Sequence, residues 1–514
     1  MTTWRTRAGD VLADRSRWSW YLGLTAAVLL LLGSGWYQAF DIAPYYQADE
    51  QAHAGYVMEL HHGRLPTIDT KIDADSGGWI LQQRVKLTPD RNDDIWVANN
   101  PPLAYVVAAP AAALTRALGW PGGPLLGLRL TNVAFFALTA VFVGRLGRRL
   151  SGGDTDVGIL SAAVFAAVPH VAGIGGAGYI DGIALLCSVA LLDTLVDLTQ
   201  AGPTRRQVIT LAAWCTLGVG VRPMTAAFAG VAAAGALAII GFRQLRRRLA
   251  PADGGAPVGA PGVVWSALVI GVPTLLVNGW YYLRNRRLYG DVTGSERLFE
   301  KFDRTARDLP ITDVWRHEVW SMPVKILFNR RLPLSQPSGE QLIWGWTYRS
   351  LLALLVVTAG LVIADQVRAR RRGEAPRTPA QGWIALAVLV VVVIGLTLQH
   401  WQGGGNIHPR YLLFGVVGAA YIVTVPLVRF RLRWLVVALV GGLLVLQADE
   451  IPEMNRSIQS ASWLQRAPRE LGSPLGPDWL RFAGVPVMVL GVIALLVAVV
   501  AVGRTPAKPV EPPA

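Results

Sequence analysis

The sequence is poor in charge and almost free of cysteine. Charged residues make up 16% of its 514 residues, against about 25% in an ordinary soluble protein, and hydrophobic residues make up 52%. Its two cysteines, Cys187 and Cys215, both lie in apolar segments, which excludes a disulfide-rich secreted scaffold and a Cys-X-X-Cys metal site. This composition also excludes a soluble enzyme and a disordered regulator, and it predicts a polytopic membrane protein.

The sequence also lacks the short motifs of nucleotide-dependent and hydrolytic enzymes. It contains no Walker A sequence, no GxGxxG opening a βαβ unit, no HExxH and no GxSxG. These absences argue against nucleotide-driven work by this chain. An enzyme that has no nucleotide-binding site and works at the outer face of a membrane needs an activated donor that is already in the membrane.

Long apolar runs predict twelve membrane-spanning helices. Runs such as 384–398 and 485–502 are apolar almost without interruption, and a bilayer core of about 30 Å needs roughly 20 residues of helix. The predicted spans are 19–39, 126–144, 157–176, 180–199, 208–221, 224–242, 263–283, 345–364, 382–399, 411–427, 434–447 and 482–502. The expected fold is therefore an all-α polytopic membrane protein.

The placement of arginine predicts the orientation of these spans. Of 48 basic residues only five are lysine, and arginine-rich segments precede the first span and follow the second, fourth, sixth, eighth and tenth. The positive-inside rule assigns this side to the cytoplasm, together with residues 1–18 and a disordered tail, 503–514. One exception is the RNRR run at 284–287. The net charge of +14 then reflects topology, so membrane lipids rather than nucleic acid are the expected partners of these cations.

Three long loops face the opposite, outer side. The first, 41–125, is acidic, with ten carboxylates but only five basic residues up to Asn100. The second covers 284–344 and the third covers 448–480. Within the first loop, residues 102–118 begin with a proline and predict a short helix on the outer surface rather than a span.

The first outer loop begins with a group of chemically active side chains. In QADEQAH, residues 47–53, two adjacent carboxylates, Asp49 and Glu50, are followed by His53, which a helix places on the same face. A carboxylate here can take a proton from a hydroxyl, and His53 can orient it or help to bind a metal. The alternative interpretation is an ordinary acidic helix start with Asp49 as its N-cap.

Charged residues also stand at the outer ends of predicted spans: Arg129, Asp181, Arg222, Arg284 and Arg410. Placing one charge near lipid costs roughly 2.5–3.5 kcal/mol, so such residues usually face a cavity or a partner. The planar donors of a guanidinium bind phosphate bidentately. For any single arginine, snorkelling to the headgroups is the alternative. Four of them beside the acidic motif predict a phosphate-binding cavity.

Taken in order, these motifs resemble those of a known enzyme superfamily. They are QADEQAH at 47–53, NNPPLAY at 99–105, Arg129 before the second span, YLRNRRLYGD at 282–291 and HPRYLLF at 408–414. Together they resemble the integral-membrane GT-C glycosyltransferases that use polyprenyl-phosphate sugars, such as protein mannosyltransferases and aminoarabinose transferases. The resemblance implies a GT-C fold with a catalytic membrane module over 19–430, followed by C-terminal helices in 431–502.

The resemblance implies an inverting glycosyltransferase whose active site faces outward from the bacterial cytoplasmic membrane. Its donor is a polyprenyl-phosphate monosaccharide, and its acceptor is an envelope glycan, lipid or protein. The implied base is Asp49, and Glu50 is the second candidate. A lipid phosphate leaves as an anion, so arginines replace the acid that a glycosidase needs. The implied donor-phosphate ligands are Arg410, Arg284, Arg222 and Arg129. The implied substrate-binding residues are Tyr46, His53, Asn100, Tyr105, Asp181, His408 and Tyr411.

The sequence leaves the metal and two other functions open. Some relatives use a divalent metal and others do not; Asp49, Glu50 and His53 are the candidate ligands, and no other cofactor is expected. A secondary transporter or a flippase for lipid-linked sugars suits the twelve spans. A polysaccharide polymerase or ligase shares the arginines and the outer loops. The large outer loops and the position of the acids favour the glycosyltransferase.

Overall fold

The computed structural model of the chain consists of helices and their connections. It describes residues 2–72 except 46 and 48, residues 94–249 except 121, residues 261–307, parts of 353–405, residues 409–459 except 431, and residues 475–504 except 476. Within these residues the only extended pairing is one isolated antiparallel bridge between Lys71 and Asp94. The predicted all-α fold is therefore confirmed for this part of the chain.

Six helices are long and apolar enough to cross a membrane, which makes this a polytopic membrane protein. They are α1 (Thr2–Asp41), α5 (Pro124–Leu150), α8 (Asp181–Ala201), α10 (Pro223–Leu249), α11 (Val263–Tyr289) and the contiguous α19 (Asp478–Phe482) and α20 (Gly484–Arg504). Further helices are α9 (Arg205–Val219), α17 (Leu413–Arg429) and α18 (Arg433–Gln459). Predicted spans 345–364 and 382–399 lie largely outside the described residues, so the total of twelve stays a prediction.

One predicted span, 157–176, is divided into two helices. α6 (Thr155–Ala167) and α7 (Pro169–Gly175) are bent by 64° at Val168. Pro169 has no amide hydrogen to continue α6, and it restricts Val168 to an extended backbone with φ −67° and ψ 121°. The prediction of a single continuous helix is therefore wrong. The chain then turns through residues 176–180 into α8.

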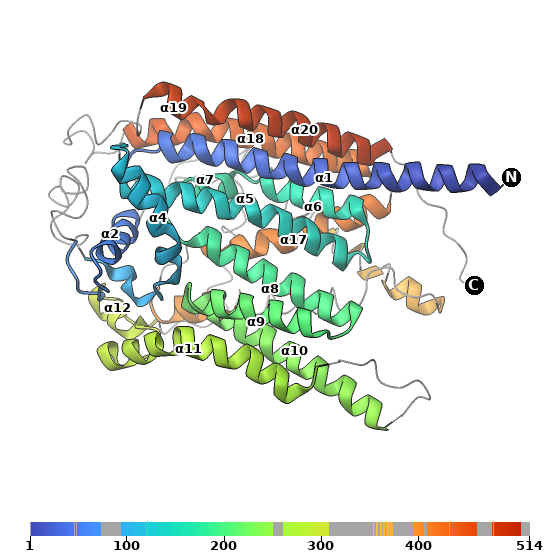
Figure 1. Cartoon of the computed structure of the whole chain (residues 1–514). Coiled ribbons are helices and arrows are strands. Elements are labelled where there is room, and N and C mark those ends of the chain that lie inside the picture. The colour runs from blue at the N-terminus through green and yellow to red at the C-terminus, as the bar shows by residue number, and fades with distance from the viewer. Residues whose placement is uncertain are drawn as a thin grey trace.

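The long helices lie side by side along one direction (Figure 1). Three short helices, α2 (Glu50–His61), α4 (Leu103–Ala117) and α12 (Ser295–Lys301), gather at the end opposite the N-terminal end of α1. α4 matches the short helix predicted over 102–118 and packs against α2 and α5. Its 15 residues extend about 22 Å, which is less than a bilayer core.

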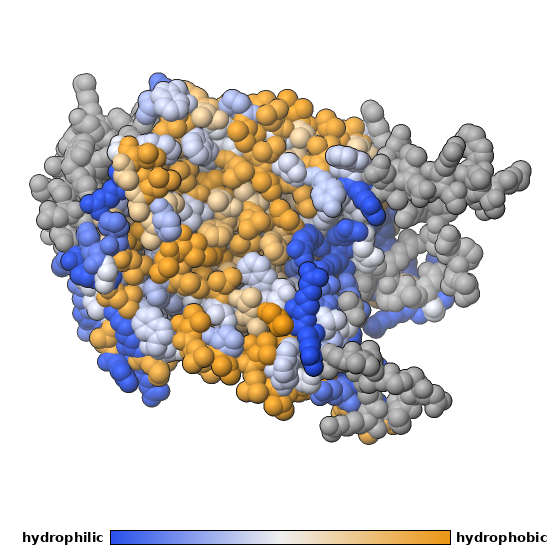
Figure 2. Space-filling view, viewed as in Figure 1, coloured by the Kyte–Doolittle hydropathy of each residue, from blue (hydrophilic) through white to orange (hydrophobic). Residues whose placement is uncertain are grey.

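Polar residues gather at both ends of the bundle, on either side of a broad apolar band (Figure 2). The end opposite α2 holds arginines that follow the second and sixth predicted spans. Arg148 lies over the Trp20 ring at 5.2 Å, and Arg243 donates to the Thr199 carbonyl oxygen at 2.7 Å. These arginine-rich connections thus meet at one end of the bundle. That this end faces the cytoplasm stays a prediction.

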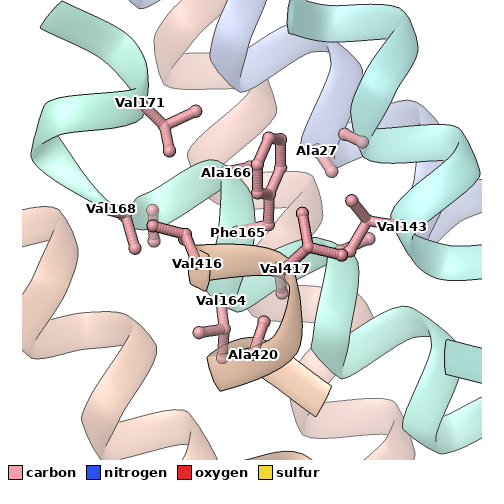
Figure 3. Packing of buried hydrophobic residues seen from close by; sticks show 14 of the residues in the cluster. Ala27, Val143, Val164, Phe165, Ala166, Val168, Val171, Val416, Val417 and Ala420 are labelled. Atoms are coloured by element: carbon pink, nitrogen blue, oxygen red, sulfur yellow. The ribbon is translucent and has the colours of Figure 1, made fainter. Parts of the chain in front are cut away.

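The bundle core contains many small and β-branched residues. α6 and α17 meet in a cluster of buried side chains (Figure 3), which includes Val164, Phe165, Ala166, Val416, Val417 and Ala420. A Cβ atom at Gly33 of α1 would lie 2.2 Å from the backbone nitrogen of Met488 in α20. These two helices therefore touch backbone to backbone, as small residues allow in membranes. The C-terminal α20 thus packs within the same bundle as the first helix.

Candidate active site

Asp49 lies just before α2, at one polar end of the bundle. Its backbone is left-handed, with φ 73°, and its side chain makes no capping hydrogen bond to α2. The alternative interpretation, in which this side chain caps the helix, is therefore not supported. Its carboxylate, 25% exposed, instead forms an ion pair with Arg410. A left-handed conformation costs a non-glycine residue about 1–2 kcal/mol, and such strain is concentrated at functional sites.

Arg410 belongs to the short 3₁₀ helix η3 (Pro409–Leu412), which leads into α17. Its guanidinium carbon lies 4.7 Å from the ring centroid of Tyr179 and 5.5 Å from that of Tyr411. Such cation–π contacts restrain the position of a desolvated guanidinium. The ion pair therefore brings together the two predicted motifs QADEQAH and HPRYLLF.

Glu50, the first residue of α2, is fully buried and pairs with Arg129 of α5. Its carboxylate oxygens accept hydrogen bonds from Arg129 Nε and Nη2 at 2.9 and 2.8 Å, and from the Gly178 amide at 2.7 Å. This carboxylate has no solvent contact and is held by three donors. These contacts favour Asp49 over Glu50 as the proton acceptor.

Arg129 has a role that differs from the predicted one. Its other three N–H groups donate to the carbonyl oxygens of Ala39, Ile42 and Ala43, at 2.9, 2.7 and 3.1 Å. Together with the two bonds to Glu50, these use all five N–H groups of the guanidinium. This arrangement leaves no N–H group for an anion, so it gives no support to the prediction that Arg129 binds the donor phosphate. Arg129 instead ties the end of α1 to the start of α2.

A third ion pair lies in the same polar cluster. Arg222, at the turn between α9 and α10, donates to Asp181 at the start of α8 at 2.7 Å, and both side chains are largely buried. The second carboxylate oxygen of Asp181 is buried and accepts no hydrogen bond from the described residues. Three carboxylates and three arginines are thus paired one to one: Asp49 with Arg410, Glu50 with Arg129, and Asp181 with Arg222.

His53 connects these ion pairs to a group of aromatic rings. Its Nδ1 lies 2.8 Å from the Tyr105 hydroxyl. The rings of His53 and Tyr179 form a T-shaped contact, with their centroids 5.6 Å apart. Burial lowers the pKa of His53 to about 3, so the imidazole is neutral at pH 7. The charged residues that act on it are Asp49, Arg410, Asp181 and Arg222. The fold therefore brings the predicted residues Tyr105, Asp181 and Asp49 together near His53.

Three buried tyrosines, Tyr56, Tyr105 and Tyr281, form a cluster beyond His53. Tyr105 stacks on Tyr56 with ring centroids 3.9 Å apart, and the Tyr56 hydroxyl donates to the Asn100 carbonyl oxygen at 3.2 Å. The Tyr281 hydroxyl donates to the Ala98 carbonyl oxygen, in the same segment as Asn100. Asn100, a predicted substrate-binding residue, thus contributes its carbonyl group to this tyrosine cluster, and its side chain donates within its own turn.

Arg284 lies at the end of α11, against the same tyrosine cluster. Its guanidinium carbon is 5.5 Å from the centroid of Tyr281, and Nη2 donates to the Pro66 carbonyl oxygen at 2.8 Å. Neither contact involves Arg410, because Tyr281 lies on α11 itself and Pro66 lies in the first outer loop. They therefore give no support to the prediction that the two arginines bind one phosphate. They do explain why Arg284 lies on the predicted outer side, where the positive-inside rule leads us to expect few arginines.

The candidate metal ligands Asp49, Glu50 and His53 do not fit a shared metal ion in this arrangement. Glu50 is held by Arg129, and Nδ1 of His53 faces the Tyr105 hydroxyl. No group of three or more His, Cys, Asp or Glu side chains in the described part of the chain is arranged as a metal site. The predicted substrate-binding residues Tyr46 and His408 lie outside the described residues.

The segment 176–180 is part of the site, although the sequence did not identify it. Gly178 donates its amide to Glu50, and Tyr179 lies against both His53 and Arg410. The bend at Val168 and the short α7 lead the chain into this segment. The sequence feature that could have identified this segment is Pro169 followed by the glycines of GIGGAGYID at 173–181, a pattern typical of an interrupted helix.

Comparison with solved structures finds matches that cover most of this chain. ArnT from Cupriavidus metallidurans bound to undecaprenyl phosphate is 14% identical, over 94% of this chain and 78% of that chain, with a TM-score of 0.46. The Archaeoglobus fulgidus oligosaccharyltransferase in complex with Zn and sulfate is 12% identical, over 88% of this chain and 58% of that chain, with a TM-score of 0.41. No protein-family model matches the sequence, and no curated protein does either.

Proposed function

We propose that this protein is a GT-C-type glycosyltransferase that acts at the outer face of the bacterial cytoplasmic membrane. It moves a monosaccharide from a polyprenyl-phosphate donor to a hydroxyl group of an envelope glycan, lipid or protein. The observation that carries this proposal is the pair of Asp49 and Arg410 at a polar end of a membrane bundle. A proton acceptor and a guanidinium suited to phosphate lie there side by side.

The proposed reaction needs few groups besides these two. The acceptor oxygen bonds to the anomeric carbon while the bond from that carbon to the phosphate oxygen breaks, so the anomeric configuration inverts. The proton of the acceptor hydroxyl passes to the Asp49 carboxylate. The lipid phosphate leaves as an anion that Arg410 stabilises by charge, so no acid is required.

The neighbouring residues serve binding and positioning in this proposal. The second carboxylate oxygen of Asp181 is suited to accept a hydrogen bond from a sugar hydroxyl, because it accepts none from the described residues. Arg222, which holds the first oxygen, is the second candidate ligand of the donor phosphate. Arg129 and Glu50 fix the start of α2 and thereby the position of Asp49.

A transfer assay with the purified full-length protein tests this function. Envelope extract from a strain that lacks the protein serves as acceptor, and several radiolabelled polyprenyl-phosphate sugars serve as donors. We expect the wild type to transfer one of these sugars and Asp49→Asn to lose transfer while it remains folded. Undiminished transfer by both Asp49→Asn and Glu50→Gln would overturn the proposal. Product formed only from diphosphate-linked oligosaccharides would favour a polymerase or ligase instead.

A further inference from the structure

Arg410 and Asp49 differ in how firmly the fold holds them. The Arg410 side chain is 9% exposed and lies against the rings of Tyr179 and Tyr411. The Asp49 side chain is more exposed, and its left-handed backbone is strained. If the pair opens, Asp49 is therefore the partner that moves, while the guanidinium stays in place.

The structure does not favour the opening of the other two ion pairs of the cluster. In the pair of Glu50 and Arg129 both side chains are fully buried, and every N–H group of the guanidinium already has an acceptor. In the pair of Asp181 and Arg222 the carboxylate is almost completely buried. The pair of Asp49 and Arg410 alone among the three has a substantially exposed carboxylate.

We propose that Arg410 exchanges one anion for another when the donor binds: the lipid phosphate takes the guanidinium and displaces Asp49. This inference rests on the proposed function and adds a regulation of the same site. A carboxylate held by a guanidinium is stabilised as an anion and is a weaker proton acceptor than one that has lost this partner. Asp49 therefore becomes an effective base only after the donor has arrived, which sets the order donor first, acceptor second.

A binding measurement with a sugar-free polyprenyl phosphate tests the exchange, because the probe contains the competing anion and no reacting sugar. The purified full-length protein is titrated with the probe, and its dissociation constant is measured for each variant. We expect Asp49→Asn to bind the probe about tenfold to hundredfold more tightly than the wild type, because Asp49 no longer competes for Arg410. Asp49→Ala is expected to show the same direction of change.

Two matched variants separate competition from a general loss of negative charge. Asp181→Asn removes one carboxylate from the same cluster but leaves the pair of Asp49 and Arg410 intact, so a much smaller gain is expected. In an Arg410→Ala background, Asp49→Asn is expected to change the affinity little, since the shared partner is gone. An equal gain in Asp181→Asn, or a full gain in the Arg410→Ala background, would overturn the exchange.

The wild-type measurement distinguishes the two proposals. If the wild type binds the probe and Asp49→Asn binds it equally or less well, the exchange is wrong and the proposed function stands. If the folded wild type does not bind a polyprenyl phosphate at all, both are wrong. Thermal unfolding of each variant in the same detergent shows whether a loss of binding comes from a loss of the fold.

Discussion

Two groups of paired arginines, one at each polar end of the bundle, are buried to different degrees. At the end where α5 and α8 finish, Arg145 and Arg149 pair with Asp193 through side chains that are 44% and 25% exposed. At the α2 end, the side chains of Arg129 and Arg410 are 0% and 9% exposed. Both groups of arginines pair with carboxylates, and the burial of the arginine side chain distinguishes the two groups.

This difference separates arginines that orient the protein from arginines that build a site. A solvent-exposed ion pair contributes about 0–1 kcal/mol, so an exposed arginine acts mainly through its charge at the membrane surface. Removing one partner of a buried pair costs about 3–5 kcal/mol, because it leaves an uncompensated charge. A buried arginine at the end of a span therefore indicates a site more strongly than an arginine-rich sequence does.

The largest difference between the two polar ends is expected in their accessibility to a reagent that cannot cross the membrane. His62 is exposed at the α2 end and Arg206 is exposed near the start of α9. We expect a membrane-impermeant thiol reagent to label His62→Cys in intact spheroplasts and Arg206→Cys only after lysis, because the arginine-rich end is predicted to be cytoplasmic. The wild type, whose cysteines are buried, is the control. The reverse labelling would put the candidate site in the cytoplasm and contradict the proposed function.

The next contrast concerns the rate of transfer. Asp49→Asn keeps the shape of the side chain but removes the proton acceptor, so we expect the rate at saturating donor to fall by about 10²–10⁴. Asp197→Asn is the matched control, since Asp197 pairs with Arg149 at the other end of the bundle. It is expected to transfer sugar at close to the wild-type rate. Similar initial rates for the two variants would mean that Asp49 is not the base.

The sequence predicts much of the fold because the membrane constrains it strongly. Long apolar runs indicate the helices, and Pro102 indicates where α4 begins, at Leu103. The order of the motifs also predicts that Asp49 and Arg410 share a site although 361 positions separate them, and the two residues form an ion pair. These features depend on hydropathy, on proline and on residue type, all of which can be read along a single chain.

The partners of each arginine could not be predicted in the same way. The sequence groups Arg129, Arg222 and Arg284 as phosphate ligands because all three stand at the ends of spans. Arg129, however, donates to three backbone carbonyl groups as well as to Glu50, and Arg284 donates through Nη2 to the carbonyl group of Pro66. A carbonyl group is present in every residue, so its availability depends on the local backbone conformation and leaves no pattern in the sequence.

Stability is expected to give the third contrast. Arg129→Met leaves Glu50 buried without its cation and frees three carbonyl groups, so we expect a loss of about 3–5 kcal/mol in the free energy of unfolding. Arg145→Met at the other end should lose only about 0–1 kcal/mol, because Arg145 is substantially exposed. Chemical denaturation in detergent measures both values. Adding Glu50→Gln to Arg129→Met should restore part of the loss; no recovery would show that the buried charge is not its cause.

The smallest contrast is expected in how stability depends on pH. Burial lowers the pKa of His53 to about 3, from about 6.5 in an unfolded chain. The unfolded state therefore binds the proton more readily, and His53 destabilises the fold by about 1.4 kcal/mol when the pH falls from about 7.5 to about 5.5. His53→Gln, which keeps a hydrogen-bonding group near Tyr105, should lose this part of the pH dependence, whereas His61→Gln, at an exposed position, should keep it. Free energies of unfolding at the two pH values check the prediction, and an equal pH dependence in His53→Gln and the wild type would mean that His53 is not held neutral in the folded protein.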